Sequence, residues 1–129
     1  MDLEYNWRKI EHKFPDVYSG HNYPAIYTWV LVSKRGKKSY YLGQTDNLSN
    51  RIKYYMDPGP SQKTNIRINS EMRKSEEVKL YLLDLKTLKL NGKNLTSIAL
   101  RDSDIRRGLE GLLIRELRIQ KNGHTILNL

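Results

Sequence analysis

The chain has 129 residues, a length that suits one domain, and 38% of them are hydrophobic, which is enough for a buried core. No stretch approaches the roughly 20 apolar residues of a membrane span, which excludes a transmembrane protein, and no apolar segment after Met1 indicates a signal peptide. The absence of cysteine excludes disulfides, thiol chemistry and thiolate metal sites, and it is compatible with a cytoplasmic location.

Positive charge is concentrated in one third of the chain. The 23 Lys and Arg outnumber the 14 Asp and Glu, and residues 33–74 carry +7 of the net +9. Such a local excess attracts polyanions, of which nucleic acid is the commonest, although a solvated basic surface has the same composition. The basic residues of this segment are Lys34, Arg35, Lys37, Lys38, Arg51, Lys53, Lys63, Arg67, Arg73 and Lys74.

The first predicted element is a helix within an N-terminal extension of about residues 1–23. Four apolar residues are separated by four, three and four positions, which is the period of a helix, and Pro15 is expected to end it. Residues 16–24 are predicted to be loop. The four apolar residues are Leu3, Trp7, Ile10 and Phe14.

A β-hairpin is predicted next, over residues 25–43. Residues 25–32 are rich in β-branched and aromatic side chains and too few for a core helix, so they predict a strand. A turn containing Gly36 leads into a return strand, residues 39–43.

The rest of the chain predicts three helices and one or two strands. The order indicates an α+β fold, a small and mostly antiparallel three-stranded sheet flanked by helices in a single domain. The segment 86–100 is left undecided, although Asn91-Gly92 marks a turn that would suit a small hairpin insert. The predicted elements are a helix at 48–56 capped by Asp46 or Asn47, a break at 57–60, a helix at 64–75, a strand at 78–85, a helix from about 103 to 120 capped by Asp102 or Ser103, and a short strand or tail at 125–129.

Several groups able to handle a phosphodiester fall in the basic segment. Pairing in the hairpin brings Tyr27 near Tyr40 or Tyr41, and Arg51 and Tyr55 share one helix face because they are four residues apart. Arginine binds phosphate through a planar fork, and a phenol can donate to phosphate oxygens or pass a proton when positive charge lowers its pKa. Taken singly, a strand tyrosine is usually a packing residue and a helix arginine is usually solvated.

The spacing of these residues resembles a known family. Ala25-Ile26-Tyr27 followed by Tyr41-Leu42-Gly43 resembles the paired tripeptides of the GIY-YIG nuclease superfamily, with Ala25 in place of the usual glycine and Leu42 in place of isoleucine. The resemblance covers about residues 24–129 and implies that family's sandwich fold.

The segment after the second tripeptide strengthens the resemblance. Arg51 stands eight residues after Gly43, where the family's catalytic arginine belongs, and residues 43–52 resemble the family's connecting segment throughout. Tyr55 occupies a position that is often histidine in the family. The tyrosine variant is similar to some restriction enzymes and small phage endonucleases of the superfamily, and residues 50–55 look closest to the phage type. This likeness implies a cytoplasmic location, in a bacterial cell or a phage-infected host.

The family needs one metal-binding glutamate on a later helix, and Glu110 is the candidate. It lies on an apolar side of the predicted helix, where a carboxylate is costly unless a partner such as a divalent cation compensates it. Gly108 and Gly111 flank it, and because each helix glycine costs about 1 kcal/mol relative to alanine, they suggest close approach of backbone or ligand. The structural alternative is that Glu110 pairs with one of three arginines, in which case Glu116 is the fallback. The three are Arg106, Arg107 and Arg115.

The resemblance also implies roles for the C-terminal end. Asn128 resembles an asparagine that helps to orient the phosphate or the metal ligand, whereas Asn122 precedes a glycine and indicates a helix stop. No two of the histidines have metal-ligand spacing, so zinc is not expected. The histidines are His12, His21 and His124.

The function implied by the resemblance is metal-dependent hydrolysis of phosphodiester bonds in DNA, with double-stranded DNA as the expected substrate. One divalent cation, Mg²⁺ or alternatively Mn²⁺, would have Glu110 as its only protein ligand. Tyr27 would act as general base or relay, and Arg51 would stabilise charge on the phosphate. Tyr41 and Tyr55 would hold the water or the phosphate.

Two other functions remain open from the sequence. One is a nucleic-acid-binding module on the same fold without catalysis, and the other is an interaction domain for an acidic protein partner. An appended DNA-reading domain is not visible, so the protein reads a short site, acts as a homo-oligomer, or cuts with little sequence preference. The side chains expected to contact nucleic acid are Lys34, Arg35, Lys37, Lys38, Lys53, Lys63 and Arg67, although Lys34 to Lys38 equally suit a solubilising edge.

Overall fold

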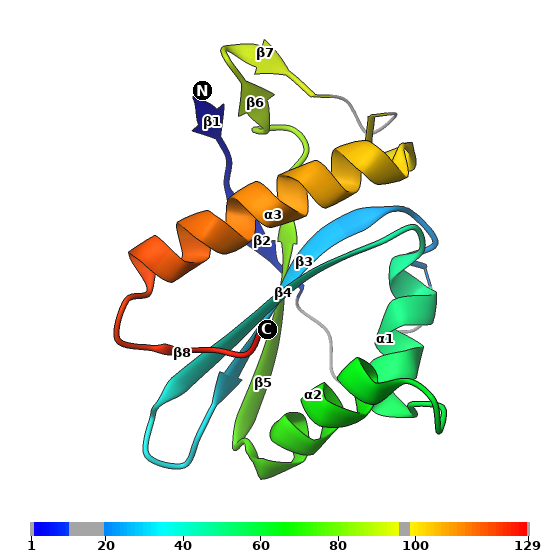
Figure 1. Cartoon of the computed structure of the whole chain (residues 1–129), viewed down its shortest axis with the longest axis vertical. Helices are drawn as coiled ribbons and strands as arrows, with labels where there is room; N and C mark the ends of the chain where they lie inside the picture. Colours follow the sequence, from blue (N-terminus) through cyan, green and yellow to red (C-terminus); the bar gives the residue numbers. More distant parts are fainter. Residues whose placement is uncertain (1, 11–19, 96–98, 129) are drawn as a thin grey trace.

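The computed structural model describes residues 2–10, 20–95 and 99–128, and it has an α+β architecture in three layers. Helix α3 covers one face of a central sheet, and α1 and α2 lie on the other face (Figure 1). In chain order the elements are β1 (Leu3–Glu4), β2 (Trp7–Lys9), β3 (Ala25–Val32), β4 (Lys38–Thr45), α1 (Leu48–Met56), α2 (Lys63–Lys74), β5 (Glu77–Leu83), β6 (Lys89–Leu90), β7 (Lys93–Asn94), a 3-10 turn (Ala99–Arg101), α3 (Ser103–Gln120) and β8 (Thr125–Ile126).

The central sheet has five strands in the order β2-β5-β3-β4-β8. Its middle three, β5, β3 and β4, are antiparallel neighbours and correspond to the three strands predicted from the sequence. The prediction of a three-stranded sheet is too small, because β2 adds an antiparallel edge and β8 adds a parallel one. A second sheet, in the order β1-β6-β7, is separate from the first.

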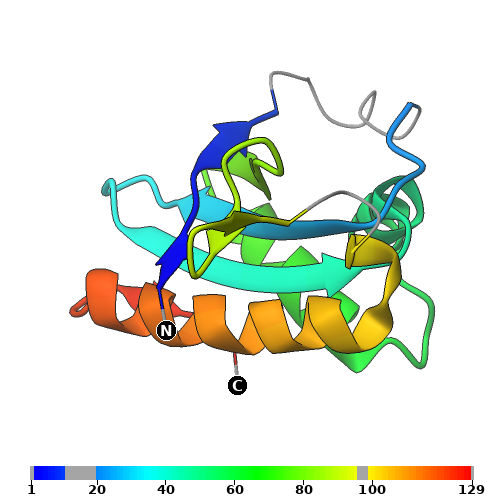
Figure 2. The same ribbon diagram turned by 90° about the horizontal axis from the view of Figure 1, so that it is seen from above.

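Alternation along β3 sends its side chains into two cores. Tyr27 and Trp29 join Ile52 of α1 and Ile68 of α2 on one face. On the other face, residues of β3 and β4 join the apolar side of α3, which runs beside the long strands in the view from above (Figure 2). Within the described residues, no helix combines the length and apolarity needed to cross a bilayer.

The helix predicted at the N-terminus is wrong for the residues that the structure describes. Residues 3–4 and 7–9 form β1 and β2, with Trp7 opposite Leu83 of β5 and Leu3 opposite Leu90 of β6. The predicted continuation through Phe14 lies outside the described residues. Side chains at 3, 5 and 7 are half-buried and those at 4, 6 and 8 are exposed. Burial in this segment therefore follows the two-residue period of a strand and not the period of a helix.

Local capping signals place α1 and α3 as predicted. The Asn47 side chain accepts from the backbone of Asn50 at the start of α1, and the Asp102 side chain caps α3 in the same way. The undecided segment contains the small hairpin β6–β7, whose turn residues Asn91 and Gly92 both have positive φ, 51° and 79°.

Candidate active site

Tyr27 lies where the hairpin leaves no room for a side chain on its partner strand. Tyr27 of β3 is directly opposite Gly43 of β4, and its ring leans over that glycine. A Cβ atom at position 43 would lie only 2.5 Å from the Tyr27 hydroxyl oxygen. Glycine at this position is therefore needed for the tyrosine to occupy its place.

The Tyr27 hydroxyl is paired with the hydroxyl of Tyr55 from α1. The two oxygens are 2.7 Å apart and buried, and either one can donate. The Tyr55 ring also contacts Trp29 and Tyr41 edge-on, with the Tyr41 ring centre at 6.2 Å. Tyr41 is thus the hairpin tyrosine that shares the face of Tyr27, whereas Tyr40 points to the opposite face and packs on His124.

Burial keeps both paired phenols protonated at neutral pH. Removal from water raises the pKa of Tyr27 above its ordinary value, and the hydrogen bond from Tyr55 and the charge of Arg51 only partly oppose this. The pKa of Tyr55 is raised by burial and by its two tyrosine neighbours. Neither hydroxyl is ionised at neutral pH, so neither can act directly as a base. Each is suited to hydrogen bonding and to relaying a proton.

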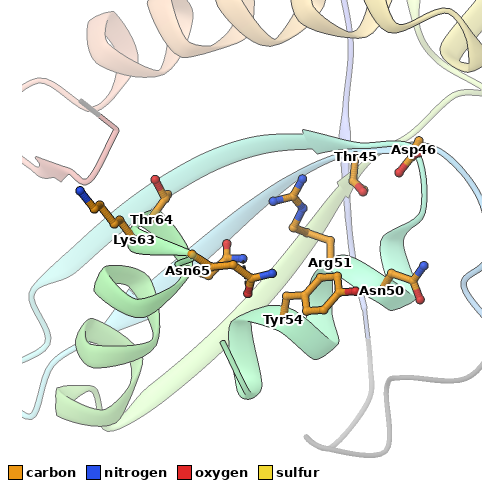
Figure 3. Close-up of a pocket in the computed structure, with 9 residues that line it drawn as sticks. Thr45, Asp46, Asn50, Arg51, Tyr54, Lys63, Thr64 and Asn65 are labelled. Atoms are coloured by element: carbon orange, nitrogen blue, oxygen red, sulfur yellow. Dashed lines mark hydrogen bonds between the residues drawn. The ribbon is translucent and has the colours of Figure 1, made fainter. Parts of the chain in front are cut away.

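Arg51 extends from α1 between the tyrosines and a surface pocket. Its charge acts on Tyr27, Tyr55 and Glu110, and its side chain lines the pocket, as Figure 3 shows. Within the described part of the chain no carboxylate oxygen lies within 4 Å of its guanidinium group. The planar fork is therefore open to an anion such as phosphate.

Glu110 reaches the same place from the opposite layer, on α3. It is half-buried, and burial raises the pKa of its carboxyl group, while a hydrogen bond from the Gln44 backbone and the charges of Arg51 and Arg107 work in the other direction. No described Lys or Arg nitrogen is within 4 Å of this carboxylate, so the structural alternative, pairing with an arginine, is not formed as a direct ion pair.

The glycines that flank Glu110 are not in close contact with the rest of the described chain. Gly108 and Gly111 are exposed, and a Cβ atom added at either would meet nothing within 4 Å. Of the two predicted causes, close approach of backbone is therefore wrong within the described chain, and close approach of a ligand stays a prediction. Both glycines lie on the solvent side of α3, which turns away from the sheet.

The outer edge of β4 explains how Glu110 and Asn128 are held. Strand β8 pairs with the first part of this edge, and the Asn128 side chain then accepts from the Leu42 N–H at 2.9 Å and donates to the Leu42 carbonyl at 2.7 Å. Gln44 follows, and its backbone lies beside the Glu110 carboxyl group. Asn128 therefore positions the strand beside Gly43, with its side-chain oxygen and nitrogen each bonded to the Leu42 backbone, and Asn122 is exposed beyond the end of α3.

A single carboxylate is the donor that the structure offers to a metal at this place. Among the described residues no group of three or more His, Asp or Glu side chains could hold an ion by itself. Glu116 is about 9 Å further along α3, and it faces Tyr5 and β1 instead of Arg51. His21 is engaged with Tyr23, and His12 lies outside the described residues.

The basic residues expected to contact nucleic acid lie either at the hairpin tip or on helices α1 and α2. Lys34, Arg35, Lys37 and Lys38 are exposed at the hairpin tip, about 17 Å along the strands from Tyr27 and Gly43. Lys63 lines the pocket that Arg51 also lines. Lys53 is exposed on α1, and Arg67 is half-buried on α2.

Arg106 is a positioning residue that sequence reasoning missed. It is buried, and its guanidinium donates to the Gln44 side chain at 2.8 Å and to the Leu100 carbonyl at 2.7 Å, which ties the start of α3 to the end of β4. The signal was available, because Arg106, Leu109 and Leu113 follow at helical spacing, so the arginine falls on the apolar face.

Comparisons with protein-family models, with curated proteins and with solved structures find no match. The likeness to GIY-YIG nucleases therefore depends on the motif residues themselves.

Proposed function

We propose that this protein is a divalent-metal-dependent DNA endonuclease of the GIY-YIG type, which hydrolyses phosphodiester bonds. The observation that carries the proposal is the convergence of four side chains from three elements around Gly43. Tyr27 comes from β3, Arg51 and Tyr55 from α1, and Glu110 from α3, and their charges and hydroxyls act on one another. A structural core needs no such mixture of a carboxylate, an open guanidinium and hydroxyls.

Arg51 and the tyrosines have complementary roles in this proposal. Arg51 binds the scissile phosphate and stabilises the charge that develops on its oxygens. In hydrolysis the water oxygen bonds to phosphorus, the bond to the leaving oxygen breaks, and the water proton must leave. The Tyr27 hydroxyl orients this water and relays its proton to a phosphate oxygen, and the leaving oxygen takes up a proton from solvent. The position of Tyr27 is itself fixed by Tyr55 and by the space above Gly43. Asn128 is a positioning residue.

The residues present fit one divalent cation. Glu110 is a partly buried carboxylate without a direct ion pair in the described chain. Because burial disfavours its ionised form, a bound cation would stabilise it. Mg²⁺ commonly binds through one or two carboxylates, with water and phosphate oxygens as its other ligands. When bound, the ion would supply Lewis-acid stabilisation of the leaving oxygen.

The test is cleavage of supercoiled plasmid DNA with Mg²⁺, with Mn²⁺ and with EDTA. We expect nicking or linearisation that requires metal, and at least a 10²-fold loss in Arg51→Lys, because an ammonium cannot replace the planar fork. Arg8→Lys, an exposed arginine on β2, is the matched control and should cut normally. Metal-independent binding without any cleavage would instead favour a nucleic-acid-binding module.

A further inference from the structure

A pocket of about 390 Å³ opens beside the candidate active site (Figure 3). It lies between the end of β4, helix α1 and the first turn of α2, and Arg51 lines it. Its lining does not include Tyr27 or Glu110, so it is a neighbouring site that shares one residue with the catalytic group. Its volume lies in the range of pockets that take small organic ligands.

Part of the pocket wall is rigid because its polar groups satisfy one another. The Gln62 side chain accepts from the Gly59 backbone at 2.9 Å and from the Asn65 amide at 3.2 Å. Thr45 is buried and bonded to the backbone of Asn47 in both directions. These groups have little capacity left for a ligand, and they fix the shape of the pocket.

The rest of the wall is exposed and chemically mixed. Tyr54 is 44% exposed, whereas the other Tyr and Trp side chains that the structure describes are buried or half-buried. Within the described residues, the side-chain polar groups of Asn50, Tyr54, Lys63 and Thr64 make no hydrogen bond or ion pair with the protein, and all four residues line the pocket. Arg51 and Lys63 bring two positive charges against the one carboxylate of Asp46 at the exposed rim.

We propose that this pocket holds one unpaired nucleotide of the DNA strand, next to the phosphodiester that Arg51 binds for cleavage. The inference rests on the proposed function and names its substrate class. The Tyr54 ring stacks on the base, as aromatic side chains do with single-stranded nucleic acid. Lys63 and Arg51 bind the flanking phosphates, and Asn50 and Thr64 hydrogen-bond to the base edge or the sugar.

The charge and the size of the pocket together favour a nucleotide over a simpler ligand. The excess of positive charge selects an anion over a cation. Phosphate alone would fill a small part of the space and would leave the Tyr54 ring and the Asn50 amide without a contact. Because extruding a base from a duplex costs free energy, which is least at a mismatch or a bulge, the protein should prefer DNA with an unpaired nucleotide at the cut.

Binding is tested first, without metal, so that the result does not depend on cleavage. 2′-Deoxyadenosine 5′-monophosphate is titrated into the full chain and followed by amide chemical shifts, with deoxyadenosine and inorganic phosphate as separate probes. We expect shifts around Asn50, Tyr54 and Lys63 with the nucleotide, and much weaker binding of each part alone. Equal binding of inorganic phosphate and the nucleotide would overturn the proposal.

Matched variants separate stacking from charge. Tyr54→Ala should weaken nucleotide binding by roughly ten-fold, and Tyr54→Phe, which keeps the ring, should restore it. Lys63→Ala should weaken binding of the nucleotide but should not change binding of deoxyadenosine. Lys93→Ala removes the same charge from the distant strand β7 and should change neither affinity. Unchanged nucleotide affinity in both Tyr54→Ala and Lys63→Ala would contradict the pocket assignment.

Cleavage then distinguishes this inference from the proposed function. With Mg²⁺, we expect a duplex carrying one unpaired nucleotide to be cut at least ten-fold faster than the same duplex fully paired, and Tyr54→Ala to abolish that preference. Cutting of both duplexes at equal rates would overturn the pocket proposal and leave the endonuclease intact. Nucleotide binding through Tyr54 without any cleavage would support the pocket and overturn the endonuclease.

Discussion

At the scale of single residues, the fit between Tyr27 and Gly43 fixes the geometry of the candidate site. The ring occupies the volume where any other residue at position 43 would place its Cβ, so Gly43→Ala must displace either the ring or strand β4. We expect a loss of about 1–3 kcal/mol in unfolding free energy from this overpacking, together with roughly 10²-fold lower cleavage because Tyr27 moves. Denaturant melts and plasmid cleavage measure the two effects.

The same substitution at an exposed glycine is the control. Gly108 lies in the interior of α3 with open space around it, so Gly108→Ala should stabilise the protein by about 1 kcal/mol and leave cleavage unchanged. If Gly43→Ala were as stable and as active as Gly108→Ala, the close approach of Tyr27 would have no role.

The bond between the Tyr27 and Tyr55 hydroxyls can be separated into stability and chemistry. Either single change to phenylalanine leaves one buried hydroxyl without its partner and should cost about 1–2 kcal/mol, whereas the double variant should recover most of that loss. Activity should follow a different pattern, with Tyr27→Phe down roughly 10²-fold and no recovery in the double variant. If the double variant recovered both cleavage and stability, the two hydroxyls would have only a structural role.

At the scale of elements, strand β4 lies at the centre of the candidate site, and the Asn128 side chain pairs with its outer edge. Strand β8 is only two residues long, and Asn128 continues the ladder by pairing both polar atoms with the Leu42 backbone. Asn128→Asp keeps the acceptor and loses the donor, so the ionised aspartate should destabilise the protein by about 1–2 kcal/mol at neutral pH.

Acidification provides the check on Asn128. The protonated aspartate can again donate to the Leu42 carbonyl, so the deficit relative to wild type should shrink as the pH falls through the carboxyl pKa, near pH 4. Melting temperatures of both proteins at neutral pH and at about pH 3 test this. A deficit that does not change with pH would mean that the second hydrogen bond is unimportant.

At the scale of the whole molecule, positive charge at the hairpin tip is remote from the candidate site. Replacing Lys34, Arg35, Lys37 and Lys38 with serine should weaken DNA binding for all sequences alike. It should also flatten the plot of log affinity against log salt, by about 0.9 for each phosphate that these side chains neutralise. The cleavage rate at saturating DNA should stay within a few-fold of wild type. An unchanged slope of log affinity against log salt would mean that the charges at the tip do not contact DNA and serve instead to keep the sheet edge soluble.

The sequence predicted those parts of the fold that depend on local signals. The hairpin and the three later helices follow from β-branched runs, caps at Asn47 and Asp102, and the turn at Gly36. The prediction of an N-terminal helix is wrong because the apolar residues there fit both a helical period and a strand period. Leu3, Trp7 and Ile10 fit a helix, but Leu3, Tyr5 and Trp7 also alternate with polar residues, and the free edge of β5 decides in favour of a strand.

The grouping of the site residues was predictable, but their individual contacts were not. Motif spacing brings together Tyr27, Arg51 and Tyr55, because they lie on adjacent elements. The placement of Glu110 beside the Gln44 backbone depends on which part of the β4 edge β8 leaves unpaired. The pocket depends on the angle between α1 and α2, which no local pattern specifies.

The central claim is that Glu110 is a metal-binding carboxylate and not a structural one. Without metal, burial raises its pKa, so the folded state favours the protonated form, and the stability that this contributes is lost as the pH rises through that pKa. Glu110→Gln removes the buried charge, so at neutral pH the metal-free variant should melt at or above the wild-type temperature.

The most direct test is a melting curve of wild type and Glu110→Gln with and without Mg²⁺, followed by DNA cleavage on the same preparations. We predict that Mg²⁺ with DNA present raises the wild-type melting temperature and supports cleavage, and that the variant shows neither effect while it still binds DNA. A variant that is destabilised without metal, yet still cuts DNA when Mg²⁺ is added, would contradict the account.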